Sequence, residues 1–376
     1  MKIAVAVSGG IDSLYALTAL SAAGHEVLAL HARFTDAPSD PVPGLDACCS
    51  QLGIPLHVED LRREFRRGVI RSYVGAHVRA LTPNPCAQCN RLMKFGRLLG
   101  LAESLGAEKL ATGHYACLEP NPAYGVGQFL RSLAGNPKDQ SYFLSLVPIG
   151  RLQRVLFPLA GLRKEEIRTR MGEKGLEPPV PGESQDICFV PRDDYRSFLQ
   201  KEAVGNTVRL GGPGPVVLWD TGAVIARHDG LWRYTEGQRK GLGIPWSEPL
   251  YVLRRDSISN TLFVATKRFI MTETATAGEI NCLVPPALWP DELFVRTRFR
   301  QPPVRAKVSI HTESRPEAGQ IRTGIGGIAS EKPGSEEDAA TLSVRFSAPQ
   351  EPHAPGQVLA VYDAGGFILA GGILTA

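Results

Sequence analysis

The first thirteen residues constrain the fold of this chain more than any other stretch. Ile3 to Val7 is a short apolar run rich in β-branched residues, which predicts a buried strand. Ser8-Gly9-Gly10 follows it, and from Asp12 onward apolar residues recur at helical spacing until Gly24 ends the pattern. A strand, a glycine loop and a helix N-terminus together suit a phosphate group, because glycine lets the backbone approach an anion and free N–H groups point at it.

The loop is neither a Walker A loop nor a dinucleotide-binding loop, because it lacks the Gly-Lys-Ser/Thr ending of the first and the third glycine of the second. Its six residues, Ser8 to Ser13 (SGGIDS), resemble the pyrophosphate loop of the ATP pyrophosphatases, which cleave ATP to AMP and pyrophosphate. A tight turn with an Asp/Ser helix cap is the simpler interpretation. The full six residues directly after a strand favour phosphate binding.

The chain changes character twice along its length. Strands and helices alternate up to residue 202, which predicts an α/β domain with a doubly wound parallel sheet. Short β-type runs with glycine turns then predict a small β-rich domain at 203–250. The region 251–376 predicts a β-barrel, with strands expected at 251–254 and 261–264 among others. Within the barrel region, Glu313–Asp338 is rich in Gly, Glu and Ser and predicts a mobile insertion.

Composition narrows the cellular setting. No apolar run approaches the roughly 20 residues of a membrane span, so we expect no membrane partner. The N-terminus has one lysine and then polar loop residues where a signal peptide needs an apolar region, which predicts a cytoplasmic protein. Seven cysteines in a cytoplasmic enzyme of 376 residues indicate catalysis or metal binding rather than a disulfide framework.

Two stretches are strongly basic. Between Leu61 and Arg97 nine basic residues stand against a single acid, Glu64, although the whole chain carries a net charge of only +4. Either stretch alone would suit a solvated surface, but two of them beside an ATP loop predict a nucleic-acid partner. The second stretch comprises Arg296, Arg298, Arg300, Arg305 and Lys307.

The cysteines of greatest interest are Cys86 and Cys89, which open a helix after two prolines, and Cys188, which lies in a polar loop before an apolar run. A helix N-terminus stabilises a thiolate, and the nearby Lys94 adds positive charge. A structural zinc half-site is the alternative, but no further ligands follow nearby. We expect the other cysteines to be structural: Cys48, Cys49, Cys117 and Cys282.

Seven motifs, in order along essentially the whole chain, are similar to those of the tRNA-specific 2-thiouridylases. They are SGGIDS, TPNPCAQCNRLMKF, ATGHYA, NPKDQSYFL, ESQDICF, GQRKGLG and GQVLAVYD with LAGGIL. The resemblance implies an adenine nucleotide alpha hydrolase-like sheet and ATP-dependent replacement of the C2 oxygen of a wobble uridine in tRNA by sulfur. It also implies Mg²⁺ as a cofactor, and a sulfur-donor protein or sulfide as a partner.

The resemblance assigns roles to individual residues. Asp12 serves adenylation, Cys188 receives sulfur as a persulfide, and Cys89 is the nucleophile that releases it or closes a redox disulfide with Cys188. ATP contacts are implied at Ala6, Val7, Ser8, Gly9, Gly10, Ile11, Asp12, Ser13, Ala32 and Gly113. Contacts with tRNA are implied at Asn84, Pro85, Cys86, His114, Lys138, Asp139, Gln140, Arg298, Phe299 and Gln357.

Cys86 departs from the commoner form of the family, which has aspartate at this position. Two mechanisms stay open. In one, Cys89 and Cys188 run a persulfide relay and Cys86 is a bystander. In the other, Cys86, Cys89 and Cys188 together ligate a [4Fe–4S] cluster whose fourth iron carries hydrosulfide.

Two other functions compete with thiolation. A different ATP pyrophosphatase, such as a lysidine synthetase or an amide-forming ligase, would need no cysteine in the site. A tRNA-binding or iron–sulfur protein without turnover would need no intact pyrophosphate loop, so the complete SGGIDS sequence argues against it.

Overall fold

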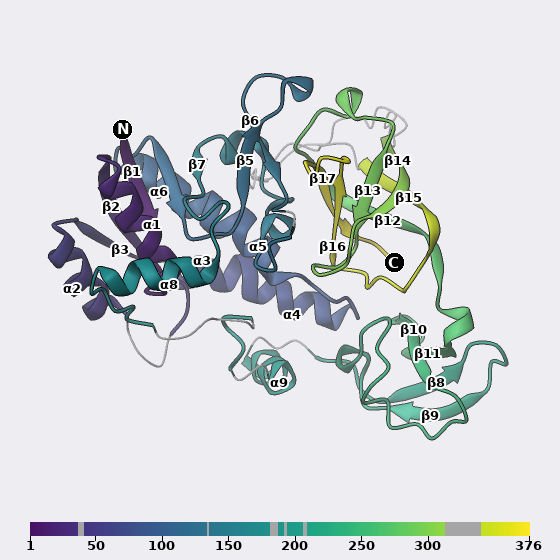
Figure 1. Cartoon of the computed structure of the whole chain (residues 1–376). Helices are drawn as coiled ribbons and strands as arrows, with labels where there is room; N and C mark the ends of the chain where they lie inside the picture. The colour runs from purple at the N-terminus through teal and green to yellow at the C-terminus, as the bar shows by residue number, and fades with distance from the viewer. Residues whose placement is uncertain (37–40, 134, 181–186, 192–193, 206–208, 313–339) are drawn as a thin grey trace, which may run out of the picture.

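Figure 1 shows the computed structural model, which describes residues 1–36, 41–133, 135–180, 187–191, 194–205, 209–312 and 340–376. Within these residues the strands form a parallel sheet near the N-terminus, a four-stranded sheet in the middle of the chain and a closed barrel at the C-terminus. The expected insertion at 313–338 lies outside them. No helix in the described part is both long and apolar enough to cross a membrane.

The N-terminal sheet is covered on both faces. Its order is β3-β2-β1-β4-β7, and each neighbouring pair is parallel. Ile3 and Val5 pack with the helices of one face, whereas Ala4 packs with Phe95 on the other. This arrangement confirms the predicted doubly wound sheet. The elements are β1 (Lys2–Ala6), α1 (Ile11–Ala22), β2 (Glu26–Arg33), α2 (Val42–Leu52), β3 (Leu56–Asp60), β4 (Lys109–Thr112), β7 (Val155–Leu156) and α8 (Lys164–Glu173).

Two long helices carry the basic segment and the cysteine motif, and each contains a π-helical stretch. The helix of the basic segment ends at Val78, and Ala80 turns the chain with a φ of 55°. The second helix begins at Pro85, where proline suits the first turn. The first consists of α3 (Arg62–Phe65), η1 (Arg66–Ile70) and α4 (Arg71–Val78), the second of α5 (Pro85–Cys89), η2 (Asn90–Leu98) and α6 (Leu99–Ser104).

Shorter elements link this part of the chain to the middle sheet. β5 (Cys117–Pro120) and β6 (Gln128–Arg131) form an antiparallel hairpin. Ser141–Leu144 is a single 3₁₀ turn. Two helices follow, α7 (Ile149–Leu152) and α9 (Tyr195–Gly205).

The middle sheet corrects one expectation. Its strands are β8 (Gly214–Leu218), β9 (Val224–His228), β10 (Leu250–Asp256) and β11 (Thr261–Thr266), in the order β10-β11-β8-β9. The strands expected at 251–254 and 261–264 as part of the barrel therefore belong to this sheet. The reason is a long-range parallel pairing of β11 with β8. Alternating apolar residues specify a strand but not its partner.

The barrel closes through six strands in the order β12-β15-β14-β13-β16-β17. Alternate residues such as Val295, Leu342 and Leu369 fill its core. Closure leaves no free strand edge, which confirms the predicted C-terminal barrel. The strands are β12 (Thr272–Cys282), β13 (Leu293–Arg296), β14 (Val304–Thr312), β15 (Ala340–Gln350), β16 (Val358–Tyr362) and β17 (Ile368–Leu374).

All three units meet at Thr82, three residues before Pro85, where the cysteine helix begins. Its N–H donates to the Pro355 carbonyl (2.7 Å), and its carbonyl accepts from the Gln357 side chain (2.9 Å). Its hydroxyl accepts from Arg255 (2.8 Å), whose fully buried guanidinium pairs with the buried Glu236 (2.6 Å). The middle sheet and the barrel therefore fix the chain that enters the cysteine helix.

Glu236→Ala should destabilise the protein by about 3 kcal/mol, because it leaves the buried charge of Arg255 without its carboxylate. Urea unfolding measures the loss. Glu292→Ala is the control, because Glu292 pairs with Arg305 at the surface and its loss should cost under about 1 kcal/mol. Equal losses in the two variants would contradict a structural role for the buried pair.

Candidate active site

The glycine loop leaves β1 and opens α1. Gly9 has a φ of 87°, and a side chain there would meet Val180 and Pro41, so glycine is required. Ser13 closes the loop, because its hydroxyl donates to the Gly10 carbonyl (2.8 Å) and accepts from the Ser8 N–H (3.1 Å). The N-cap residue is Gly10, which has no side chain to bond the free N–H groups in the first turn of α1. The loop is therefore shaped for an anion at the helix N-terminus.

The other predicted ATP contacts border this loop. Val7 accepts a hydrogen bond from His31 Nδ1 (2.8 Å) through its carbonyl, and that bond fixes the end of β2 against the end of β1. Ala6 and Ala32 are half-buried at the ends of these two strands. Both strands end at the carboxyl edge of the sheet, where ligands of such folds bind.

Asp12 is held by two side chains that the sequence analysis missed. The Tyr115 hydroxyl donates to Oδ1 (2.8 Å), and the ammonium of Lys164 lies 2.6 Å from Oδ2. Asp12 keeps 29% of its side chain exposed, whereas Lys164 keeps 5%. Tyr115 belongs to the ATGHYA motif and Lys164 to none of the seven motifs, and they lie 103 and 152 positions from Asp12, so only the folded chain brings them together.

Gly113 lies directly against the first turn of α1. A Cβ atom at this position would be 2.9 Å from the Asp12 carbonyl carbon and from the Ser13 nitrogen, which are backbone atoms. The next residue, His114, is buried and bonds Thr112 Oγ1 through Nδ1 (2.8 Å). Its Nε2 accepts from Lys94 (3.3 Å), because an ammonium group only donates. Burial and the Lys94 charge hold the pKa of His114 well below its usual value.

Lys94 is also the cation shared by the three cysteines of interest. Cys89 is buried, whereas Cys86 and Cys188 are exposed. Burial raises the pKa of Cys89 to about 12. Cys86 and Cys188 keep exposed surface, but the protein packed around them still removes water from their thiols and raises their pKa, and the charge of Lys94 opposes the rise in all three. The thiols also raise one another's pKa, Cys188 and Cys86 acting on Cys89. Such effects weaken with distance, so all three thiols lie within electrostatic range of Lys94.

An aromatic cluster keeps the turn of Cys188 beside the cysteine helix. Phe189 packs edge-on against Phe65 and Tyr73, with ring centroids 5.7 Å and 5.4 Å apart. Cys89 belongs to the same buried cluster. Residues 183–186 of the ESQDICF motif lie outside the described part of the chain.

The cluster and disulfide predictions stay open. All seven cysteines are free thiols in this structure. Across the described residues, no three histidine, cysteine or acidic side chains lie close enough to hold a metal ion.

Several residues expected at tRNA contacts have internal bonding partners. Asn84 caps the cysteine helix, with its Oδ1 accepting from Ala87 N (3.1 Å). Buried Asp139 accepts from the Ser132 and Ser141 hydroxyls, both at 2.8 Å. Gln140 accepts from Tyr115 N (3.0 Å) through its side chain. These four bonds position the helix start and the loops of the site.

The remaining predicted tRNA contacts lie on two surfaces. Pro85 is buried in the first turn of the cysteine helix, and Lys138 is half-buried. In the barrel, Arg298 lies 3.5 Å from Glu351, and Phe299 packs on Phe143 with centroids 4.4 Å apart. A pocket of about 390 Å³ at the domain junction is lined by Thr82, Thr235, Glu236, Gly237, Gln238, Arg298, Ala354 and Gln357.

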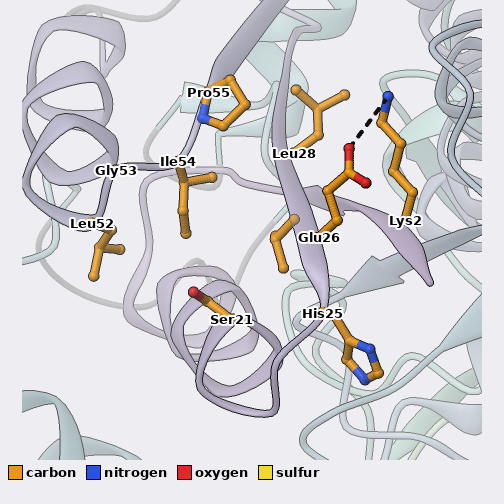
Figure 2. Close-up of a pocket in the computed structure, with 10 residues that line it drawn as sticks. Lys2, Ser21, His25, Glu26, Leu28, Leu52, Gly53, Ile54 and Pro55 are labelled. Carbon is orange, nitrogen blue, oxygen red and sulfur yellow. Dashed lines mark ion pairs between the residues drawn. The ribbon is translucent and has the colours of Figure 1, made fainter.

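Figure 2 shows a second pocket, of about 440 Å³, whose lining includes Lys2, His25, Glu26 and Pro55. It lies where β1, β2 and β3 begin, and Lys2 pairs with Glu26 across it (3.9 Å). The glycine loop follows the opposite end of β1. This pocket is therefore not part of the candidate site.

The fold and the loop define a class, a HUP-type nucleotide-binding protein with an appended β-sheet and barrel. Residues 1–192 match the family described as tRNA methyl transferase HUP domain, and residues 199–266 match the one described as tRNA methyl transferase PRC-barrel domain. The chain belongs to the family of the tRNA-specific 2-thiouridylases, since it is 47% identical to the protein of that name from Lawsonia intracellularis over 100% of this chain and 99% of the other.

Other relatives agree with this placement. The 2-thiouridylase of Oleidesulfovibrio alaskensis is 46% identical, again over 100% of this chain and 99% of its own. Among solved structures, a U34-tRNA thiolase from Methanococcus maripaludis with its [4Fe–4S] cluster is 15% identical and covers 55% of this chain and 66% of its own, with a TM-score of 0.34. A likeness this weak says nothing about the cofactor of this chain.

Alkylation with iodoacetamide at about pH 8 should modify Cys188 before Cys89, because Cys188 is exposed and Cys89 is buried with a pKa of about 12. The Cys89 rate should rise roughly tenfold per pH unit into the alkaline range, since only the thiolate reacts. Lys94→Met should slow Cys188 and leave the exposed Cys282 unchanged. Peptide mass spectrometry measures each rate, and a Cys89 rate that levels off near neutral pH would contradict the burial effect.

Proposed function

We propose that this chain is a tRNA 2-thiouridylase, which adenylates the C2 oxygen of the wobble uridine with ATP and then replaces that oxygen with sulfur. The observation that carries the proposal is the pair Gly113-His114. Gly113 lies on the ATP loop, and His114 bonds the lysine around which the three thiols gather. One strand end thus joins a phosphate site to a sulfur site. Membership of the 2-thiouridylase family supports the same reaction.

Adenylation is the task of the glycine loop. The C2 oxygen of the uridine attacks the α-phosphorus of ATP, the bond to the β-phosphate breaks, and pyrophosphate leaves with the electron pair. Mg²⁺ enters as part of the Mg-ATP substrate. The backbone N–H groups of the first turn of α1 offset charge on the phosphates, and Asp12 organises the loop through Tyr115 and Lys164. AMP on C2 is then a good leaving group, which the original oxygen is not.

Sulfur transfer is the task of Cys188 and Cys89. A donor protein delivers sulfur to Cys188 as a persulfide, whose terminal sulfur attacks C2 and displaces AMP. The Cys89 thiolate attacks Cys188 Sγ, which breaks the S–S bond and leaves its electron pair on the sulfur now bound to C2. The product is 2-thiouridine with a Cys89–Cys188 disulfide, which a cellular dithiol reduces. In a variant of this route, Cys89 attacks Cys188 Sγ before the terminal sulfur reaches C2. The terminal sulfur then leaves as free sulfide, which attacks C2 and displaces AMP.

Cys86 separates the persulfide route from a cluster-dependent one. The persulfide route needs only Cys89 and Cys188. The cluster alternative needs all three thiolates. Iron and sulfide assays on anaerobically purified protein distinguish them, together with Cys86→Asp. About four irons per chain, lost with activity in Cys86→Asp, would favour the cluster. Iron-free turnover from a persulfide donor would favour the relay.

A cytoplasmic enzyme fits this reaction, because uncharged and charged tRNA, ATP and sulfur donors are all available there. The partners we propose are therefore tRNA, Mg-ATP and a sulfur-donor protein. The exposed position of Cys188 suits delivery from a second protein, since a persulfide must be handed over by direct contact.

Cys89→Ser and Cys188→Ser should each lose at least 100-fold in 2-thiouridine formation while keeping tRNA-dependent release of pyrophosphate, because adenylation does not use either thiol. Asp12→Ala should lose both. Nucleoside mass spectrometry of tRNA measures the first activity and pyrophosphate release measures the second. A lysidine synthetase or ligase would be unaffected by the cysteine changes, and a non-catalytic binding protein would release no pyrophosphate.

Arg67→Ala with Arg71→Ala should weaken tRNA binding and reduce the salt dependence of its affinity by about one unit of log–log slope per lost phosphate contact. Both side chains are exposed on the basic helix, whereas Arg66 is bound to Glu202 (2.7 Å). Fluorescence anisotropy across a salt series measures the slope. Lys2→Gln, at the opposite edge of the sheet, is the control, and equal slopes in all variants would mean that this helix face is only solvated.

A further inference from the structure

Lys164 is the buried cation of the nucleotide site, and neither the motifs nor the family resemblance assigns it a role. Its side chain is 5% exposed, and its ammonium lies 2.6 Å from Asp12 in the first turn of α1. It begins α8, whose Ile167 and Met171 are packed in the core that α1 shares. The position of the ammonium is therefore set by the fold rather than by a flexible surface side chain.

A second contact fixes α8 on α1. Arg170 donates to the Tyr15 hydroxyl (2.6 Å), one turn beyond the loop. The two helices thus form one rigid body, and their N-terminal residues Asp12 and Lys164 lie together at its end. Rigid placement is what a group needs if it is to stabilise charge that develops during a reaction.

Electrostatics at this position favours an anion beyond Asp12. The N-terminus of α1 carries a partial positive charge, and a carboxylate in its first turn already offsets that charge. Lys164 adds a full positive charge in a nearly dry position. A buried ion pair is weak evidence for stability, because the desolvation of both groups cancels much of their attraction. An ammonium held in this nearly dry position beside an exposed glycine loop is instead suited to a phosphate tail.

We propose that Lys164 binds the β- and γ-phosphates of ATP and stabilises pyrophosphate as it leaves. When the C2 oxygen attacks the α-phosphorus, the bridging bond to the β-phosphate breaks and its electrons remain on pyrophosphate. The Lys164 ammonium offsets that charge, and it turns from the carboxylate of Asp12 toward the phosphate oxygens without being deprotonated. This role deepens the proposed function, since it names the residue that receives the leaving group.

Binding of Mg-pyrophosphate and of AMP to the full-length protein tests the proposal by calorimetry. Lys164→Met should weaken Mg-pyrophosphate binding roughly 10- to 100-fold, because a charge-assisted contact is lost. AMP binding should change less than about twofold, since AMP carries neither the β- nor the γ-phosphate. Lys164→Arg should recover part of the pyrophosphate affinity. Lys174→Met is the matched control, because it removes an exposed cation from the far end of the same helix and should leave pyrophosphate binding unchanged.

A double variant excludes a purely structural role. Lys164→Met leaves the Asp12 carboxylate without its cation, bonded among the described residues only by the Tyr115 hydroxyl, and so disturbs the ion pair as well as the phosphate contact. Asp12→Asn with Lys164→Met removes both charges of the pair. Comparison of this double variant with Asp12→Asn alone should show the same 10- to 100-fold loss of pyrophosphate affinity. Equal affinities in that pair, or wild-type affinity in Lys164→Met, would overturn the proposal. Formation of 2-thiouridine by the wild-type protein tests the proposed function separately, so the two can fail independently.

Discussion

The close approach of Gly113 to the first turn of α1 is the contact on which the site depends. A single added carbon would lie 2.9 Å from backbone atoms of Asp12 and Ser13, which cannot move without opening the glycine loop. Because Gly113 can lie there, His114 is carried to Lys94, and Lys94 lies among the thiols. The proposed phosphate site and the proposed sulfur site therefore both adjoin the end of β4 and are positioned by the same sheet.

The middle sheet and the barrel contribute by fixing the chain that enters the cysteine helix. Thr82 is bonded by Arg255 from the first and by Gln357 and Pro355 from the second. Two residues later Asn84 caps the helix. A polyanion that binds either appended domain would therefore act, through Thr82, on the helix that carries Cys86 and Cys89. This connection explains why residues implied at tRNA contacts also have internal partners.

Asp139, Gln140 and Gln357 illustrate what a family resemblance can and cannot supply. It marked all three, and each proves to hold a loop of the site through its side chain. A motif indicates that a residue has a role. It does not distinguish a residue that contacts the substrate from one that positions a loop, because both can give the same sequence pattern. Lys164 is the opposite case, a residue of the site that no motif marked. It pairs with Asp12 from 152 positions away, and no local sequence pattern predicts that contact.

The sequence by itself determined the elements whose stability is local. Ile3 to Val7 followed by SGGIDS predicts a strand, a loop and a helix N-terminus because each depends on residues a few positions apart. Tertiary structure alone decided the rest. It assigned β10 and β11 to the middle sheet, gathered Cys188 with Cys86 and Cys89, and seated Lys164 on Asp12. These outcomes depend on long-range strand pairing and helix packing, in which many partners fit one apolar pattern and only the whole fold selects among them.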